Sequence, residues 1–443
     1  MRLWCQWAWL GGDTAQAGVV LEVAGARLAS VEAVGPPPAD AEQLRGLTLP
    51  GLVNAHSHAF HRALRSRTQA GRGTFWSWRE QMYRLAATLT PESYARLAAA
   101  TFAEMAEAGI TTVGEFHYLH HQPGGRPYDD GNEMGEAVRA AADEAGVRLT
   151  LLDTCYLHGG IGAEPNEVQR RFADASAEAW AERVAAMEDG PTVRTGAAVH
   201  SVRAVAPAEM AVVREWSDVR ALAVHAHVSE QPAENDDCRA AYGATPVEVF
   251  GRAGLLGERF TAVHATHLTD GDITALGGSH VCFCPTTERD LADGIGPAAA
   301  LTAAGARLCL GSDSHAVIDL FEEARAVELD ARLATGERGH LPAAVLLAAA
   351  TAGGARSLGW PEAGRLEAGA LADLAVVALD TPRTAGAAPG HLVEAAVFAA
   401  AAADVCDVMV GGRWVVRDGR HLRLHVGERL SAGVAEVWGE ATA

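Results

Sequence analysis

The sequence predicts an α/β protein whose centre is a (β/α)8 TIM barrel, flanked by a small β-sandwich that both chain ends form. Three observations predict this fold. Short apolar segments alternate with helical stretches through the middle of the chain, which is typical of a parallel sheet. Eight such segments occur, and most of them end in His, Glu or Asp. The two ends of the chain carry short β-type runs separated by glycine turns instead.

The barrel is predicted over residues 50–360. Its strands are expected at residues 50–55, 111–116, 148–154, 194–199, 221–226, 261–265, 280–284 and 307–311, where aliphatic and β-branched residues gather. Ala-rich segments with helical spacing lie between them, for example residues 92–108, 167–187 and 207–217. Eight strand–helix units can close into a barrel, which carries its functional groups at the carboxyl ends of the strands.

The 443 residues exceed the roughly 250 that such a barrel typically needs. Residues 1–49 and 361–425 are therefore assigned to one flanking β-sandwich, and residues 426–443 to a C-terminal tail or helix. The apolar opening contains Gln6 and has no small-residue cleavage site, so we expect a β-strand there rather than a signal peptide. No apolar run approaches the length of a membrane span, so no membrane association is predicted.

Composition narrows the classes of function. The formal net charge of −20 argues against nucleic acid or an anionic membrane as a partner, because clustered basic residues bind both. All 36 basic residues are arginine, which excludes Schiff-base chemistry, a P-loop lysine and a carbamylated lysine that bridges two metal ions. Seven scattered cysteines without a C-x-x-C pair indicate reduced thiols and a cytoplasmic location.

Metal-ligating residues are expected at the ends of several strands. His56 and His58 stand at positions i and i+2 of a strand end, so their imidazoles share a face and can bind one ion. His227 ends a later strand, although His225 lies on the same face and competes for the role, and Asp313 follows the last strand. Imidazoles with a carboxylate suit zinc or iron. We therefore predict one divalent metal per chain, Zn²⁺ in preference to Fe²⁺.

Two further residues are candidates for moving protons. Glu230 lies three residues after His227 and can reach back over the same site. His264 ends the next strand, although a lone histidine in that place can equally be structural. We expect Asp313 and His264 to take up the proton of a metal-activated water, and Glu230 to protonate the departing nitrogen. His264 can also steady the charge of the tetrahedral intermediate. The roles of His267 and His315 stay open.

The sequence resembles the amidohydrolase superfamily, and in particular its deaminase branch with a single metal. The matching residues are 50–58, 227–230, 263–264 and 311–314 at the site, and 364–374 and 408–413 in the flanking module. The resemblance thus covers essentially the whole chain. Members with two metals use a bridging lysine on the fourth strand, whereas that strand here ends in His200. The resemblance also implies a homodimer.

Within this branch the sequence resembles the formimidoylglutamate deiminases of histidine degradation, in residues 75–80, 115–121 and 200–203. Their substrate, N-formimino-L-glutamate, is a small dicarboxylate, and guanidinium groups bind carboxylates in bidentate fashion. Arg203 and Arg79 are the candidates, with Tyr118 and His200 as polar groups that orient the substrate. A surface ion pair is the alternative for either arginine. The family has Gln three residues after the second ligand histidine, where this chain has His61.

These expectations combine into one hypothesis of function. The chain would hydrolyse N-formimino-L-glutamate to N-formyl-L-glutamate and ammonia with a metal-activated water. One alternative is a deaminase of an aromatic amidine, such as guanine or an adenosine derivative, and another is imidazolonepropionase, a ring-opening relative. A non-catalytic binding protein on this barrel is disfavoured, because it would be expected to have lost at least one of the six site residues.

Overall fold

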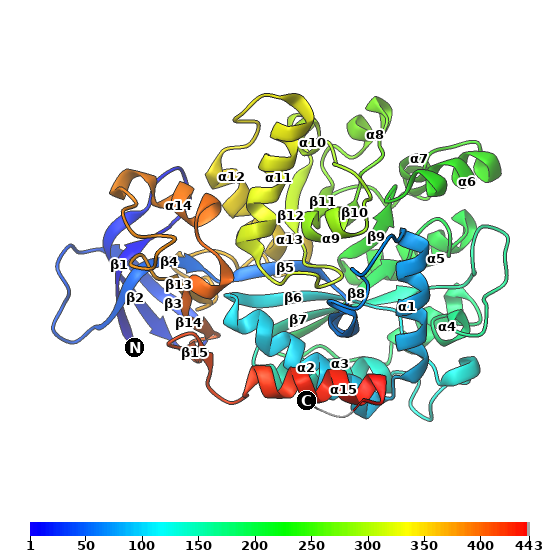
Figure 1. Cartoon of the computed structure of the whole chain (residues 1–443), viewed down its shortest axis with the longest axis horizontal. Coiled ribbons are helices and arrows are strands. Elements are labelled where there is room, and N and C mark those ends of the chain that lie inside the picture. Colours follow the sequence, from blue (N-terminus) through cyan, green and yellow to red (C-terminus); the bar gives the residue numbers. More distant parts are fainter. Residues whose placement is uncertain (441–443) are drawn as a thin grey trace.

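The computed structural model describes residues 1–440, and its centre is a parallel sheet of eight strands (Figure 1). The strands are β5 (Leu52–Ser57), β6 (Ile110–His117), β7 (Arg148–Cys155), β8 (Val193–Val199), β9 (Val224–Val228), β10 (Phe260–His264), β11 (His280–Phe283) and β12 (Arg307–Leu310). Each strand pairs in parallel with the next one along the chain. All eight predicted barrel strands are confirmed, with ends that differ by a few residues.

The barrel closes where the chain after β12 returns to β5. Ser57 and Asp313 form a parallel β-bridge, the Asp313 N–H donates to the His56 carbonyl at 3.0 Å, and the His58 N–H donates to the Asp313 carbonyl at 3.3 Å. Gly311 permits this approach, because a Cβ atom there would lie 2.7 Å from the Cβ of His56. Closure of the barrel therefore brings together polar residues from its first and last strands.

Helices surround the barrel, and α1 lies at its carboxyl-terminal mouth (Figure 1). They are α1 (Phe75–Thr88), α2 (Pro91–Glu107), α3 (Glu133–Ala145), α4 (Ala177–Val184), α5 (Pro207–Arg220), α6 (Pro232–Tyr242), α7 (Pro246–Arg252), α8 (Asp270–Ala275), α9 (Pro285–Asp290), α10 (Ala298–Ala303), α11 (Leu320–Thr335), α12 (Ala343–Ala348) and α13 (Gly354–Ser357). Shorter helical turns are η1 (Ala59–Leu64), η2 (Pro123–Gly125), η3 (Gln169–Arg171) and η4 (Ala349–Gly353). The helices predicted near 92–108 and 207–217 correspond to α2 and α5.

The single helix predicted over residues 167–187 is wrong. That segment forms η3, then an irregular stretch, and then α4, which begins after Ser176. The Ser176 hydroxyl accepts a hydrogen bond from the Ala179 N–H at 3.2 Å and so caps α4. Arg171 turns inward instead of extending a helix, and its Nε donates to the His121 carbonyl at 2.9 Å. Tertiary contacts override the local helix propensity here.

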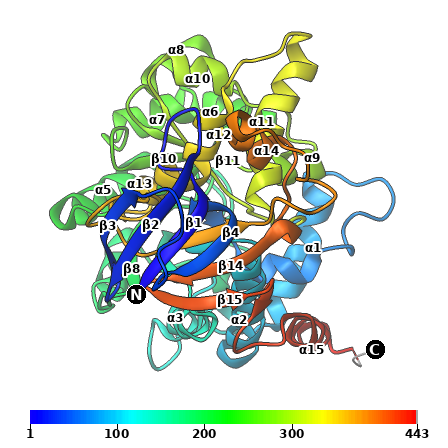
Figure 2. The ribbon, with the colours of Figure 1, turned by 90° about the vertical axis from the view of Figure 1, so that its left-hand side faces the viewer.

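The chain ends form a second sheet of eight strands beside the barrel (Figure 2). Its strands are β1 (Arg2–Ala8), β2 (Gln16–Ala24), β3 (Arg27–Ala33), β4 (Glu42–Pro50), β13 (Leu374–Val377), β14 (Val405–Val410), β15 (Arg413–Arg417) and β16 (Arg420–His421). β1 and β4 run parallel and all other neighbours are antiparallel. A separate apolar cluster, which includes Leu3, Leu21 and Val376, belongs to this module. The predicted pairing of the chain ends is confirmed, and hydrogen bonds join them into one sheet.

Further helices follow in the C-terminal part of the chain: η5 (Pro389–His391), α14 (Leu392–Phe398), η6 (Ala402–Asp404) and α15 (Val426–Trp438). α15 lies along α2 on the outside of the barrel (Figure 1), and the Trp438 indole donates to the Ala63 carbonyl at 2.9 Å. A helix thus forms in the predicted C-terminal segment, whose last residues, 441–443, lie outside the described residues. No helix within residues 1–440 has both the length and the apolar character needed to cross a membrane.

A buried ion pair connects the flanking sheet with the barrel. Arg148 begins β7, and its Nη2 lies 3.3 Å and 3.2 Å from the two carboxylate oxygens of Asp373, just before β13. The Gly411 N–H donates to the same carboxylate at 2.6 Å. Burial raises the pKa of Asp373, and the Arg148 guanidinium partly offsets that effect. The two modules therefore share one buried charge pair.

Changing Asp373 to Asn should destabilise the protein by about 3–5 kcal/mol, because Arg148 would keep a buried charge without its partner. Thermal unfolding followed by circular dichroism should show this as a lower Tm. The control is Glu436→Gln, which breaks the exposed ion pair between Glu436 and Arg96 and should leave Tm nearly unchanged. An equal Tm for the Asp373 variant and the wild type would contradict the role of this pair.

Candidate active site

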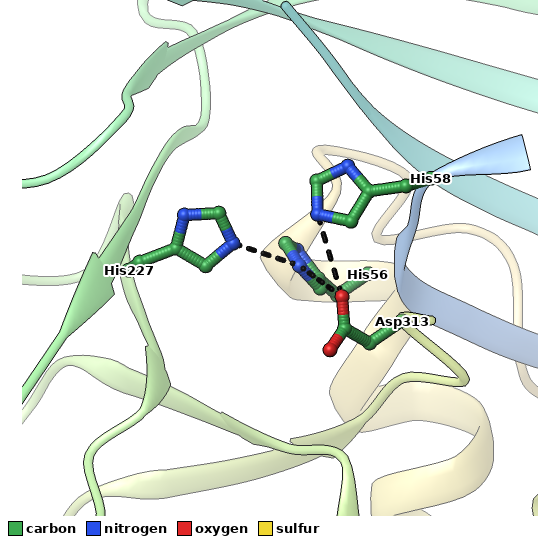
Figure 3. A group of neighbouring side chains, drawn as sticks. All are labelled: His56, His58, His227 and Asp313. Atoms are coloured by element: carbon green, nitrogen blue, oxygen red, sulfur yellow. Dashed lines mark hydrogen bonds and ion pairs between the residues drawn. The ribbon is translucent and has the colours of Figure 1, made fainter. Parts of the chain in front are cut away.

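Three imidazoles and one carboxylate converge at the carboxyl-terminal mouth of the barrel (Figure 3). His56 and His58 come from the end of β5, His227 from the end of β9, and Asp313 follows β12; one ligand atom of each lies within 4.8 Å of the others. Asp313 Oδ1 is 3.3 Å from Nε2 of both His56 and His58. His227 Nε2 is 3.2 Å from His56 Nε2. The structure thus brings together all four predicted ligands.

Hydrogen bonds on the outer side of two rings determine which nitrogen faces this centre. His58 Nδ1 donates to the Phe116 carbonyl at 2.9 Å, and His227 Nδ1 donates to the His200 carbonyl at 3.0 Å. Because a carbonyl only accepts, each Nδ1 carries the hydrogen and each Nε2 presents a lone pair to the centre. Burial lowers the pKa of His58 to about 3 and that of His227 well below its usual value. Neutral imidazoles beside a carboxylate are a donor set that can hold a divalent metal ion.

His264 and Glu230 lie beside the four predicted ligands. The His264 ring stacks on His227 with a centroid distance of 5.5 Å, and its Nε2 is 3.7 Å from Glu230 Oε1 and 4.0 Å from Asp313 Oδ2. Its Nδ1 is 3.4 Å from Glu288 Oε1. Burial lowers the pKa of His264, but Glu230, Glu288 and Asp313 outweigh it and raise the pKa to about 10. This concentration of carboxylates favours a cation at the centre.

Backbone strain gathers at the same strand ends. Ser229, His264 and Asp313 have positive φ angles of 52°, 69° and 41°. Such conformations are uncommon outside glycine and are found preferentially at functional sites, where the surrounding structure holds them in place. The strained residues are themselves predicted site residues or, as with Ser229, directly precede one.

The three histidines whose roles the sequence left open point elsewhere. His225 Nε2 donates to the Ser357 carbonyl at 2.9 Å, and His267 Nε2 donates to the Asp293 carbonyl at 2.7 Å. His315 bonds the Ser57 hydroxyl at 3.1 Å and the Ser312 hydroxyl at 3.0 Å. None of the three lines the cavity at the barrel mouth, among the residues that the structure describes. Their contacts support the backbone around the site.

A cavity of about 240 Å³ opens above the centre. All the predicted substrate-binding residues line it, together with Glu230, His264 and three of the four ligands; those binding residues are His61, Arg79, Tyr118, His200 and Arg203. Aromatic side chains that the site prediction did not include form much of the wall: Phe75, Trp76, Trp78, Tyr83, Tyr156 and Phe172. Several belong to α1, so this helix closes one side of the cavity.

The two arginines of the cavity have different partners. Arg203 Nη2 lies 3.5 Å from Glu230 Oε2, and its Nε lies 4.0 Å from Glu234 Oε2. The Arg79 guanidinium lies over the Trp76 ring, 4.4 Å from the ring centroid, and forms no ion pair with any carboxylate within residues 1–440. Arg203 does not form a surface ion pair, which was the alternative interpretation, because its side chain is only 16% exposed. Two guanidinium groups at one cavity can receive a ligand with two anionic groups.

Polar side chains next to the ligands complete the cavity wall. The Tyr118 hydroxyl lies 2.9 Å from His61 Nε2, and His61 packs against His58 with ring centroids 4.6 Å apart. His61 Nδ1 is buried without a hydrogen-bond partner among the described residues. His200 Nδ1 lies 3.1 Å from the Ser201 hydroxyl. His61 therefore lies in the cavity wall between His58 and Tyr118.

Glu115 supports the site although the predicted set did not include it. One carboxylate oxygen accepts from the Ala59 N–H at 2.6 Å, and the other accepts from the Ser57 hydroxyl at 2.6 Å. The Tyr94 hydroxyl also donates to it, at 3.2 Å. Burial raises the pKa of Glu115 to about 7. Its position two residues before the end of β6, next to β5, is the signal that could have identified it.

The structure contains a second buried group of possible metal ligands: His117, His120 and Asp153. The carboxylate of this group is already paired with a cationic side chain, Arg183. The Arg183 guanidinium donates to both oxygens of Asp153, at 2.9 Å and 3.0 Å, and the Trp180 indole donates to the same carboxylate at 3.0 Å. A divalent ion bound there would lie close to the guanidinium. We therefore assign no metal to this group.

Comparisons with known proteins identify the relatives of this chain. The model of the amidohydrolase family matches residues 47–415. The chain is 41% identical to formimidoylglutamate deiminase of Pseudomonas aeruginosa over 417 residues, which cover 90% of each chain. It is 31% identical to 8-oxoguanine deaminase of the same organism over 419 residues, which cover 92% of this chain and 90% of that one.

Solved structures show the same fold. An amidohydrolase from Brucella melitensis superimposes with a TM-score of 0.91 at 35% identity and covers 99% of both chains. An adenosine deaminase from Xanthomonas campestris with bound zinc superimposes with a TM-score of 0.84 at 26% identity, covering 99% of this chain and 97% of that one. The family match extends from β4 through the whole barrel into β15. The chain belongs to the amidohydrolase family.

Proposed function

We propose that this chain hydrolyses the formimino group of N-formimino-L-glutamate to give N-formyl-L-glutamate and ammonia. The observation that carries the proposal is that two arginines, Arg203 and Arg79, share one cavity with the group of metal-ligating residues. A substrate with two carboxylates and a hydrolysable C=N carbon matches both features. The 41% identity to a formimidoylglutamate deiminase supports the same reaction.

We assign the metal to His56, His58, His227 and Asp313, with zinc as the ion and iron as the alternative. The zinc in the Xanthomonas campestris relative supports this choice. A divalent ion bound there supplies the Lewis acidity that lowers the pKa of water from 15.7 towards about 7 in zinc enzymes. The four side chains would hold that ion next to the cavity, and the ion would activate a water molecule there.

Three side chains move protons and stabilise charge in the proposed reaction. Asp313 takes up the proton of the attacking water, and His264, whose ring the neighbouring carboxylates keep protonated, orients the water towards the C=N carbon. His264 also steadies the negative charge as that carbon becomes tetrahedral. Glu230, 3.7 Å from His264, gives a proton to the departing nitrogen, so that ammonia leaves rather than an amide anion.

The remaining residues of the cavity bind and orient the substrate in this proposal. Arg203 and Arg79 bind the two carboxylates, because the guanidinium fork matches carboxylate geometry. Tyr118, His200 and His61 supply polar atoms beside the ligands and orient the formimino group. Since substrate binding at a fixed distance from the attacking water lowers the entropic part of the barrier, these contacts contribute to rate as well as affinity.

One observation favours a second candidate, a deaminase of an aromatic amidine such as guanine. Much of the cavity wall is aromatic, including Trp76, Trp78 and Tyr83, and a relative at 31% identity is named 8-oxoguanine deaminase. Ammonia release from formiminoglutamate and from guanine, measured side by side, tests the two proposals. We expect release from formiminoglutamate at a far higher kcat/KM, and the opposite order would overturn the proposal. Imidazolonepropionase activity would open a ring without releasing ammonia.

Purified protein is expected to contain one divalent metal ion per chain, because the sequence has no lysine to bridge a second ion. Elemental analysis of the isolated protein measures this ratio. His227→Gln should lose most of the metal, whereas His225→Gln, a matched control in the same strand, should retain it because His225 bonds Ser357 instead. Two tightly bound ions that activity requires would contradict the single-metal assignment.

A cytoplasmic homodimer is the last part of the proposal. All seven cysteines are free thiols in the structure, which supports a reducing environment. Sedimentation of the purified protein should give twice the mass of one chain. A mass that stays at 46.3 kDa over the concentration range of the enzyme assay would contradict the dimer.

A further inference from the structure

We propose that Glu234 is a positioning residue that sets the spacing between Arg203, the carboxylate-binding group, and Glu230, the proton carrier. This inference rests on the proposed function. Glu234 lies in the first turn of α6 and is 2% exposed. It is absent from the described residues that line the cavity, so it acts through its neighbours rather than on the substrate.

One carboxylate contacts both segments that carry these groups. Glu234 Oε1 accepts a hydrogen bond from the Ser229 N–H at 3.3 Å, and Oε2 lies 4.0 Å from Arg203 Nε. Ser229 has a positive φ of 52° and directly precedes Glu230, so this contact holds a strained turn. Glu234 thus ties the loop after β8, which carries Arg203, to the end of β9.

Glu230 competes for the same guanidinium. Arg203 Nη2 lies 3.5 Å from Glu230 Oε2, while the Nε edge faces Glu234 and also donates to the Ser201 hydroxyl at 3.3 Å. Without the buried charge at Glu234, the attraction of Glu230 would draw Arg203 towards the proton carrier. The Arg203 guanidinium would then be oriented away from the substrate carboxylate and would bind it less well. The charge of Glu234 therefore attracts the Nε edge of Arg203 and limits how closely Glu230 draws the Nη edge away from the substrate.

The test is Glu234→Gln, which preserves shape and the acceptor for Ser229 but removes the charge facing Arg203. We expect KM for formiminoglutamate to rise about tenfold or more, with kcat within about threefold of wild type and metal content unchanged. Hydrolysis of N-butylformamidine, an amidine without carboxylates, should fall much less than hydrolysis of formiminoglutamate, because only formiminoglutamate needs Arg203 to bind a carboxylate, whereas any effect of Arg203 on Glu230 acts on both substrates. In a double variant with Arg203→Met, the loss should not exceed that of Arg203→Met alone.

Glu328→Gln is the matched control, because Glu328 is also buried and paired with an arginine, Arg332, at 2.7 Å, but lies outside the cavity. Its KM should match wild type. If Glu234→Gln does not fold, as judged by thermal unfolding, Glu234→Asp should raise KM in the same direction, because it keeps the charge but withdraws it from Arg203. An unchanged KM, or an equal loss with both substrates, would overturn the inference. Failure of the wild type to act on formiminoglutamate would instead overturn the proposed function.

Discussion

Glu230→Gln is expected to lower kcat by roughly 10²-fold or more while the metal content stays at one ion per chain. The substitution keeps the shape of the side chain but removes its ability to carry a proton, so the departing nitrogen would leave without protonation. Glu230 approaches His264 at 3.7 Å and Arg203 at 3.5 Å and does not belong to the ligand group. Steady-state ammonia release and elemental analysis of the same sample measure the two quantities.

Glu323→Gln is a suitable control for this variant. Glu323 is fully buried in α11, accepts a hydrogen bond from the Thr286 N–H at 2.9 Å, and does not line the cavity. Its substitution should leave kcat close to wild type. Loss of metal from the Glu230 variant would make Glu230 a ligand, and near-normal turnover would remove it from the mechanism.

Arg203→Met is expected to reduce kcat/KM for formiminoglutamate by roughly 30-fold to several thousand-fold. A substrate carboxylate left unpaired in a buried place costs about 2–5 kcal/mol. Metal content should stay constant, because Arg203 lies outside the ligand group. A purely structural ion pair at an exposed position would predict a change of under about 1 kcal/mol. Kinetics over a range of formiminoglutamate concentrations distinguish the two.

Two companion variants sharpen this test. Arg203→Lys keeps the positive charge beside Glu230 and Glu234 but removes the planar fork, so a partial loss would assign the effect to bidentate binding. Arg289→Met removes an arginine whose ion pair with Glu322 is partly exposed, and it should leave kcat/KM unchanged. If Arg203→Met also left kcat/KM unchanged, an aromatic amidine would become the better candidate substrate, since nothing in such a molecule requires a guanidinium there.

Much of the fold could be predicted because its signals are local. Strands of a parallel barrel are buried on both faces, so each reads as an apolar run, and all eight runs became strands. The polar residue that ends such a run must lie at the carboxyl-terminal mouth, which located His56, His58 and Asp313 without coordinates. The absence of lysine, visible only in the sequence, excluded the bridged two-metal site.

Other features depended on contacts between residues far apart in the chain. The segment 167–187 has helical composition, but Arg171 reaches inward to the His121 carbonyl and the helix does not form there. The local sequence pattern cannot predict such a contact, because the free energy of burying and pairing a side chain depends on residues that are distant in the sequence. The same reason explains why Glu115 was not predicted, since its partners Ser57 and Ala59 belong to a different strand–helix unit.

Local patterns were enough to predict the barrel, the pairing of the chain ends and a set of residues able to hold one metal ion. Tertiary structure decided how those residues are used. His225 and His227 lie on one face of the same strand, but His225 donates to the Ser357 carbonyl and only His227 reaches the centre. Glu234 contacts both Ser229 and Arg203 because the packing of α6 places its carboxylate between them. Spacing along the chain assigns a side chain to a face, whereas hydrogen bonding in the closed barrel selects its partner.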